Sequence, residues 1–446
     1  MRVLVLPFVI LLVMIPVRPI PQAPTFPRML SDEGSYVLAG GQNGTWFQPG
    51  QSQRLERISL YNDTTTSLNP APGQGTVWGG GWNGSQMLIS GWGTDSGPSG
   101  SNPYLYLYNG QKQVDGDSQN QYAAESSWHG GDIFAASYNG QDWLLSGMGS
   151  GSLNAYGNDA SNHMGLAMFD GYTFTDLSFM VPRQQDAILY ANAWNGTEWL
   201  VGGGYDSDGV LFAFNGTNMT DLTTQISGSV LEFGSVQSIG WNGQYWLIGG
   251  SGFLAKYDGQ NFTDLTSQLQ SSMTDRSMFS AAVNAVSWNG SIWMIGGGPS
   301  VAQTTTGVGW LALYDGQAGF TDLDGTLPNY VLAPSVPGSS VLSICHSGDM
   351  WVVGGYSSGQ AMLLLYDGGI SLDISYLVNT MSYVDWVDAG FTQQNFLPIE
   401  HIAVHALTTT PATIHRISMK IDVRREGVVN AGIVWMILTR LEPLRS

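Results

Sequence analysis

The chain has 446 residues, of which 43% are hydrophobic and only 11% are charged, and its formal net charge is −19. The apolar fraction is sufficient for a real core, and the regular placement of the 59 glycines argues against a disordered low-complexity chain. Only six basic residues lie between Ser31 and Gly390: Arg54, Arg57, Lys112, Arg183, Lys256 and Arg276. Nucleic-acid binding needs a basic track that releases counterions, so this composition excludes a nucleic-acid partner for the body of the chain.

Residues 1–23 have the pattern of a secretory signal peptide. Arg2 is followed by a mostly apolar run from Val3 to Val17, which is short for a membrane span of about 20 residues. Ala23 lies near a candidate cleavage site. The alternative is an uncleaved N-terminal anchor. Both interpretations predict a secreted or cell-surface protein, with the termini as candidate points of membrane or surface association.

Seven repeats of about fifty residues follow, starting near residues 32, 82, 138, 194, 241, 288 and 346. The clearest unit runs from WNG at 241–243 through a glycine pair at 249–250 and YDG at 257–259 to FTDL at 262–265. Each repeat contains four strand-like segments, a to d, rich in aromatic and β-branched residues. No window keeps a 3.6-residue apolar period, so little helix is expected.

The links between these segments predict hairpins. The a–b link is Asn-Gly in most repeats, and the c–d link is Asp-Gly or Asn-Gly. These are strong short hairpin signals, and they predict that both central turn residues take positive φ. Four-stranded units at this period predict an all-β, seven-bladed β-propeller over residues 31–390, with the repeated Trp and Tyr packed between blades.

The two ends of the repeat region are expected to meet. Repeat one lacks a good first strand before Asp32, whereas Ser382–Asp388, after repeat seven, reads as a spare segment a and is followed by Gly390. We therefore expect this C-terminal segment to complete blade one, which would remove the open edges of the sheet.

The glycine pair, the downstream Tyr-Asp and the four-strand unit resemble kelch repeats and the galactose-oxidase-like propellers that share them, over residues 31–390. The resemblance implies a propeller that, in kelch modules, is mostly a binding platform. The copper enzymes of this group use Tyr and His ligands and a Tyr–Cys cross-link. The single cysteine, Cys345, lies in a predicted segment a, and no position-by-position match exists. No catalytic residue is assigned, and no cofactor is expected.

Residues 391–446 differ from the repeats. They contain no Gly-Gly or Tyr-Asp-Gly signal and hold six of the 15 basic residues. Thr408–Pro411 suggests a short stalk, and the apolar stretch Val428–Leu438 is too short to span a bilayer. This basic tail is predicted as an interfacial segment, a docking strand or a stretch without a settled fold.

The links also indicate which face of the propeller binds. In a propeller the a–b and c–d links lie on one face, here named the hairpin face, and the b–c and d–a links lie on the other, the variable-loop face. The b–c links vary in length and carry aromatic rings, and function concentrates on variable loops of a rigid scaffold. We predict glycan or protein binding there by Trp92, Tyr104, Tyr156, His163, Tyr205, Trp310 and Tyr356.

Carboxylates give weaker signals. Asp206 and Asp208 have a spacing that Ca²⁺ could use, although Asp-x-Asp-Gly is also an ordinary turn. The aspartates of the Thr-Asp-Leu motif, such as Asp264, recur once per blade, which favours a structural role in capping a local turn. The scattered histidines form no zinc-binding pattern.

Eight Asn-x-Ser/Thr sequons are candidate glycosylation sites on a secreted chain: Asn43, Asn62, Asn83, Asn195, Asn215, Asn218, Asn261 and Asn289. Taken together, these patterns predict a non-enzymatic binding module for glycan or protein. Two alternatives stay open: a secreted carbohydrate-active or oxidase-type enzyme, and a structural component of a surface layer.

Overall fold

The computed structural model describes residues 36–43, 52–59, 64–68, 75–94, 101–108, 113–114, 131–149, 163–182, 187–205, 208–230, 233–273, 282–299, 307–317, 319–323, 327, 332, 338–347, 350–369, 371–379, 383–390, 401–407, 417–425 and 428–436. The chain divides into two compact units, one of them Asp32–Thr392 and the other formed by Met1–Ser31 with Gln393–Ser446. The expected signal peptide or anchor lies outside the described residues. Within the described part of the chain, no helix is both long and apolar enough to cross a membrane.

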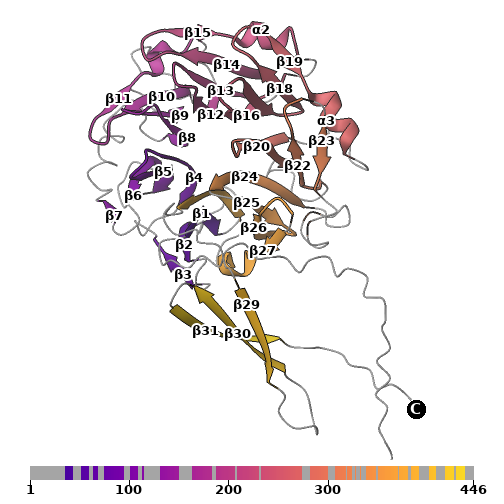
Figure 1. The fold of residues 1–446 in the computed structure, drawn as a ribbon. Helices are drawn as coiled ribbons and strands as arrows, with labels where there is room; N and C mark the ends of the chain where they lie inside the picture. The colour runs from indigo at the N-terminus through magenta and orange to yellow at the C-terminus, as the bar shows by residue number, and fades with distance from the viewer. Residues whose placement is uncertain are drawn as a thin grey trace, which may run out of the picture. The chain divides into compact units, whose positions relative to one another are not determined.

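The first unit is built from four-stranded antiparallel sheets, or blades, of which the described residues form seven (Figure 1). Blade 1 comprises β28 (Tyr383–Gly390), β1 (Tyr36–Asn43), β2 (Ser52–Ser59) and β3 (Thr64–Ser67). Blade 2 comprises β4 (Gly75–Trp82), β5 (Met87–Thr94), β6 (Ser101–Tyr108) and β7 (Gln113–Val114). Blade 3 comprises β8 (Asp132–Tyr138), β9 (Trp143–Gly149), β10 (His163–Phe169) and β11 (Phe174–Asp176).

The next four blades follow the same plan in chain order. Blade 4 comprises β12 (Ile188–Trp194), β13 (Trp199–Tyr205), β14 (Asp208–Phe214) and β15 (Met219–Asp221). Blade 5 comprises β16 (Val236–Trp241), β17 (Trp246–Gly250), β18 (Phe253–Tyr257) and β19 (Phe262–Asp264). Blade 6 comprises β20 (Ala282–Trp288), β21 (Trp293–Gly298), β22 (Trp310–Tyr314) and β23 (Phe320–Asp322). Blade 7 comprises β24 (Ser339–Ser347), β25 (Met350–Ser357), β26 (Gln360–Tyr366) and β27 (Ser371–Asp373).

The first strands of the sheets form a closed ring, and these are named the inner strands. They are β28, β4, β8, β12, β16, β20 and β24, and each contacts the inner strand of the next blade, with β24 contacting β28. A ring of sheets with their first strands around one axis is a β-propeller. The prediction of an all-β propeller of four-stranded blades is therefore confirmed.

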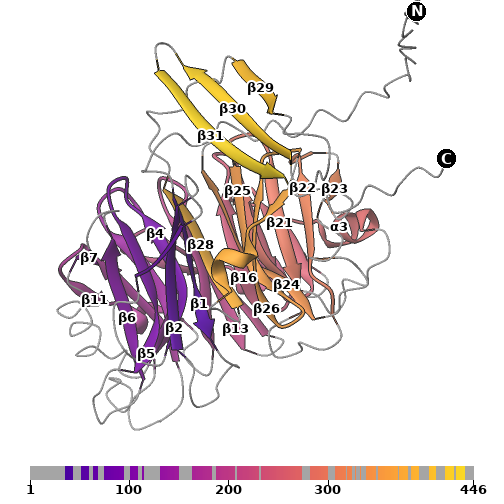
Figure 2. The same cartoon turned by 90° about the horizontal axis from the view of Figure 1, so that it is seen from below.

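The two ends of the propeller meet in blade 1. Strand β28 pairs antiparallel with β1, from Tyr36 opposite Gly390 to Gln42 opposite Tyr383 (Figure 2). The segment expected to complete this blade, Ser382–Asp388, contains most of β28, so that expectation is confirmed. The pairing joins residues that lie more than 300 positions apart in the chain.

The a–b hairpins differ from the turn that their Asn-Gly sequence predicts. Trp241 pairs with Trp246, which leaves a four-residue link, and only its glycine, Gly243, has positive φ, at 91°. Asn242 keeps negative φ because its side chain closes the turn, with Oδ1 accepting hydrogen bonds from the backbone N–H of Gln244 at 2.9 Å and of Tyr245 at 2.8 Å. The expectation of positive φ at both central residues is therefore wrong, because an Asx turn replaces the two-residue turn.

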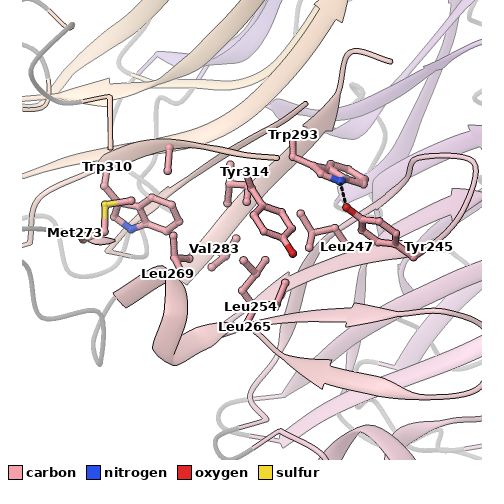
Figure 3. Close-up of a cluster of buried hydrophobic side chains, with 12 residues drawn as sticks. Tyr245, Leu247, Leu254, Leu265, Leu269, Met273, Val283, Trp293, Trp310 and Tyr314 are labelled. Atoms are coloured by element: carbon pink, nitrogen blue, oxygen red, sulfur yellow. Dashed lines mark hydrogen bonds between the residues drawn. The ribbon is translucent and has the colours of Figure 1, made fainter. Parts of the chain in front are cut away.

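Large aromatic side chains fill the spaces between blades, as the repeats predicted. Trp293 of blade 6 is fully buried beside Tyr245 and Leu247 of blade 5 (Figure 3). Its indole Nε1–H donates a hydrogen bond to the Tyr245 hydroxyl at 3.0 Å. Trp199 and Trp246 hold the matching places in blades 4 and 5 and are also buried. The core is thus divided into layers between neighbouring sheets.

The Thr-Asp-Leu motif caps a turn at the end of the fourth strand, as expected. Oδ1 of Asp264 accepts a hydrogen bond from the backbone N–H of Thr266 at 2.8 Å, and the matching bonds of Asp176 and Asp221 measure 2.9 Å. Asp373 makes the same bond at 2.9 Å from a Leu-Asp-Ile sequence in blade 7. Short helices begin at these caps, although the apolar pattern predicted little helix, because each spans only one or two turns. They are η1 (Ser178–Met180), α2 (Thr223–Ser227), α3 (Thr266–Ser272) and η5 (Ser375–Val378).

The basic tail forms a separate three-stranded antiparallel sheet. Its strands are β29 (His401–Leu407), β30 (Ile417–Arg425) and β31 (Val428–Met436), in that order. The apolar stretch from Val428 is therefore mostly a strand paired with β30. The expected stalk at Thr408–Pro411 lies outside the described residues.

Candidate functional site

Each inner strand contains a β-bulge at the same place. One residue is skipped in the pairing with the second strand, and these seven residues are named the inner row. They are Asp385 in blade 1, Trp78, Phe134, Tyr190, Gln237, Asn284 and, in blade 7, Leu342. All lie near the start of the inner strand, which follows the d–a link, so the inner row lies toward the variable-loop face. Bulges change the direction of a side chain and occur often beside functional sites.

The glycine pair of the repeat explains why the bulge recurs. Its second glycine faces the backbone carbonyl of the residue two positions before the bulge. A Cβ at Gly203 would stand 1.8 Å from the carbonyl oxygen of Ile188, and a Cβ at Gly147 would stand 1.9 Å from that of Asp132. No side chain can be accommodated at such distances, so only glycine permits this close approach.

Three neighbouring members of the inner row form a connected set of rings, named the aromatic arc. The ring centroids of Trp78 and Phe134 lie 5.3 Å apart with planes at 34°, and those of Phe134 and Tyr190 lie 5.2 Å apart at 73°. All three side chains are half-buried. The arc therefore presents partly exposed aromatic surface contributed by three blades, a suitable platform for stacking or cation–π contacts.

The other described half of the inner row is occupied by side chains that bond to the protein itself. Asn284 Nδ2 donates hydrogen bonds to Ser340 Oγ at 3.0 Å and to the Val341 carbonyl at 2.8 Å, both in the next blade. Gln237 Nε2 donates to Ser235 Oγ at 3.2 Å. The Asn284 amide therefore links blades 6 and 7, whereas the Gln237 amide bonds just before its own strand.

A buried carboxyl stands beside the aromatic arc. Asp132, the first residue of β8, is only 6% exposed, and its Oδ1 has no hydrogen-bond partner among the described residues. Burial raises the pKa of Asp132 to about 7. A buried polar atom without a partner is rare in folded proteins and calls for an explanation.

Sequence reasoning missed the inner row. A signal for it was present, because each row residue in blades 2 to 6 lies five positions before the asparagine of the a–b link, as Trp78 does before Asn83. At that position an aromatic or amide residue replaces the aliphatic one that strand alternation favours. The bulge itself was not visible, because pairing register is a property of two strands.

Two of the aromatic residues predicted to bind on the variable-loop face are buried. Trp310 and Tyr356 are 1% and 0% exposed, so the prediction that they stand in exposed loops is wrong. Trp310 begins β22 and packs in the core between blades 5 and 6, and the Tyr356 hydroxyl donates a hydrogen bond to the Pro299 carbonyl at 3.3 Å. Both residues belong to strands, β22 and β25, and their large rings fill space between the sheets.

Among the other predicted residues, Trp92 lies nearest to the inner row. It is half-buried on β5 and pairs with Thr76, two residues before Trp78. Tyr104, His163 and Tyr205 lie on strands β6, β10 and β13, and their side chains are outside the described part. Tyr156 is outside it entirely.

The metal and glycosylation predictions stay predictions. Asp208 is exposed at the start of β14, Asp206 is not described, and no group of three or more metal-ligating side chains occurs among the described residues. The described sequon residues that lie in hairpin links are Asn83, Asn195, Asn215, Asn218, Asn261 and Asn289, and all six are on the hairpin face. Asn43 ends β1, and Asn62 lies outside the described part.

The comparisons with known proteins identify no family: no family model and no curated protein matches the chain. An acylaminoacyl peptidase from Pyrococcus horikoshii is similar in structure at 10% identity and a TM-score of 0.43, over 87% of this chain and 57% of that one. The β-propeller domain of the trilobed protease from Pyrococcus furiosus is similar at 10% identity and a TM-score of 0.41, over 79% and 97%. A putative 6-phosphogluconolactonase from Bacteroides uniformis is similar at 8% identity and a TM-score of 0.46, over 80% and 100%.

These likenesses concern the fold only. The chain spans 57% of the length of the Pyrococcus horikoshii peptidase, and all three TM-scores are below 0.5. The propeller assignment therefore rests on the sheet topology of this chain. Of the expected resemblance, the propeller is confirmed, and no kelch-like family is shown.

Proposed function

We propose that the chain is a secreted or cell-surface propeller that acts as a non-enzymatic binding module, with its ligand seated at the aromatic arc on the variable-loop face. One observation carries this proposal. Trp78, Phe134 and Tyr190 break the repeat at equivalent positions of three neighbouring blades, and their half-buried rings contact each other. Partly exposed rings on a rigid scaffold, beside amide groups, suit the recognition of a sugar or a peptide.

The repeated carboxylates support binding over catalysis. A catalytic pair would have to differ from the repeat, whereas the Thr-Asp-Leu aspartates perform the same backbone-capping role in three blades, and Asp373 performs it in blade 7. Their lone pairs are directed to local N–H groups, and this arrangement explains their periodicity.

The full secreted chain, screened on glycan and peptide arrays as wild type and as Trp78→Ala, tests the proposal. Trp82→Ala is the matched control, because Trp82 lies on the same strand, is 47% exposed and stands at the hairpin face. We expect selective binding that Trp78→Ala removes and Trp82→Ala retains. Absence of selective binding, or binding that folded Trp78→Ala retains in full, would overturn the proposal.

A further inference from the structure

We propose that the ligand of the aromatic arc carries a primary ammonium group, which the arc surrounds and Asp132 receives as its counter-ion. This inference rests on the proposed function and names the chemistry of its ligand. An ammonium group of this kind occurs on a lysine side chain and on an amino sugar, and the experiment below distinguishes these two sources.

Asp132 is buried without a counter-ion among the described residues. Its carboxyl is buried, and Oδ1 lacks a partner among the described residues. Burial of an ionised carboxylate without a partner is costly, which is why its pKa is raised to about 7. A cation that arrives with its own N–H donors would supply both the missing charge and the missing hydrogen bond.

The second step is the position of Asp132 relative to the arc. In blades 6 and 7 the row residue Asn284 bonds to Ser340, which lies two positions before the next row residue. Asp132 holds the same place before Phe134. From the Asn284–Ser340 and Gln237–Ser235 pairs we infer that its carboxyl lies beside Phe134 and Trp78. The backbones confirm how close these segments are, because a Cβ at Gly79 would stand 2.2 Å from the carbonyl oxygen of Phe134.

The third step is the chemistry that this combination favours. Rings with planes inclined to each other, as at 34° and 73° here, present more than one π face to a single group. Aromatic faces attract cations by about 0.5 to 2 kcal/mol, and the effect grows when the site is desolvated. The net charge of −19 attracts cations further. A neutral sugar would use the rings and leave the buried carboxyl without a counter-ion.

The described strands that pack against β8 carry no charged side chain that faces Asp132. The strands with the main contacts to β8 are β4, β5, β6, β9 and β12. They contain no Asp, Glu, Lys, Arg or His, and their titratable side chains are phenols, namely Tyr190 on β12 and Tyr104, Tyr106 and Tyr108 on β6. Affinity for an ammonium ligand is therefore expected to fall by about tenfold per pH unit below about 7, because Asp132 must lose its proton to bind.

Calorimetric titration of the full chain tests the inference with two pairs of probes. Nα-acetyl-lysine amide and glucosamine carry the ammonium group, and Nα,Nε-diacetyl-lysine amide and N-acetylglucosamine are their neutral counterparts. The variants are Asp132→Asn, which keeps the shape of the side chain, and Asp258→Asn, which removes an exposed carboxylate on the hairpin face and makes the same change in net charge. Trp78→Leu removes one ring of the arc.

We expect at least one ammonium probe to bind at least tenfold more tightly than its neutral counterpart, and the one that does identifies the source. Asp132→Asn should remove that preference, and Asp258→Asn should keep it. Equal affinity of charged and neutral probes, no binding of any probe, or wild-type preference in Asp132→Asn would overturn the inference. If Asp132→Asn does not fold, the pH dependence of wild-type affinity tests the inference instead. An affinity that stays unchanged between pH 8 and pH 5 would overturn the inference.

Failure of the inference is distinguishable from failure of the proposed function. If the neutral probes bind, and Trp78→Leu removes this binding while Asp132→Asn retains it, the proposed binding site is supported and the ammonium ligand is rejected. Binding that Trp78→Leu does not affect rejects both.

Discussion

The inner row repeats one backbone bulge in every blade, and its members differ in the contacts that their side chains make. In blades 2 to 4 the equivalent positions hold the rings of Trp78, Phe134 and Tyr190, which contact each other. In blades 5 and 6 they hold Gln237, whose amide bonds to Ser235 just before its own strand, and Asn284, whose amide bonds to blade 7. The repeat therefore sets where a side chain leaves the sheet, and the residue type decides whether that side chain contacts a neighbouring ring or a polar group.

The largest expected effect is the loss of stability when a buried tryptophan between blades is removed, and we expect it to be similar in both halves. Trp293→Ala removes a side chain that is fully buried and leaves the Tyr245 hydroxyl without its indole donor. We expect the free energy of unfolding to fall by about 5 kcal/mol, and Trp143→Ala in blade 3 should lose a similar amount. Urea unfolding measures both. A loss below about 2 kcal/mol in either variant would show that the halves differ in the core as well.

The pH dependence of stability should show the effect of a feature present in one half of the inner row alone, the buried carboxyl of Asp132 in blade 3. Its pKa is 3.8 when unfolded and about 7 when folded, so the folded state binds the extra proton between these values. The contribution of Asp132 to stability is therefore fully present below pH 4 and decreases by about 4 kcal/mol as the pH rises to 7. Urea unfolding at several pH values should show this decrease relative to Asp132→Asn. Parallel profiles for the two proteins would contradict the expectation.

The inner row itself provides the sharpest test of the comparison. Asn284→Ala removes two hydrogen bonds to blade 7, so we expect a loss of about 2 kcal/mol in stability and unchanged ligand binding. Trp78→Ala should lose about 1 kcal/mol, because its ring is half-buried, and should abolish binding. Thermal unfolding and titration together measure this division. If both variants lost binding, the row would act as one site.

The turn caps should show the smallest effect and no difference between halves. Asp264→Ala removes the acceptor of the Thr266 N–H at 2.8 Å, and Asp176→Ala does the same for Ser178 at 2.9 Å. Each substitution should lower stability by about 1 kcal/mol, as for other helix caps. Chemical unfolding of both variants provides the check. Lost ligand binding by either variant, with stability retained, would assign the motif a role beyond capping.

The local structure of this protein could be predicted from its sequence. Asn242-Gly243 marks a hairpin, Thr263-Asp264-Leu265 marks a cap, and Trp293 marks the core, because each signal acts over a few neighbouring residues. Even here the form of the turn was missed, since Asn242 closes it with its side chain and keeps negative φ. The closure by β28 was also predictable, because a repeat with a missing strand requires one elsewhere.

The candidate site depended on the tertiary structure. Trp78 and Phe134 lie 56 positions apart and meet only when two blades pack, and the bulge that brings them together exists only in the pairing of two strands. Trp310 and Tyr356 looked like loop rings and are core, because a shift of strand ends by one or two residues exchanges exposure for burial. By itself the sequence determined the repeat, the turns and the ring closure, which follow from short-range chemistry and strand number. Only the packed sheets decided which rings contact each other and which carboxyl, Asp132, is buried on the same strand as one of them, because both depend on register and on contacts between distant segments.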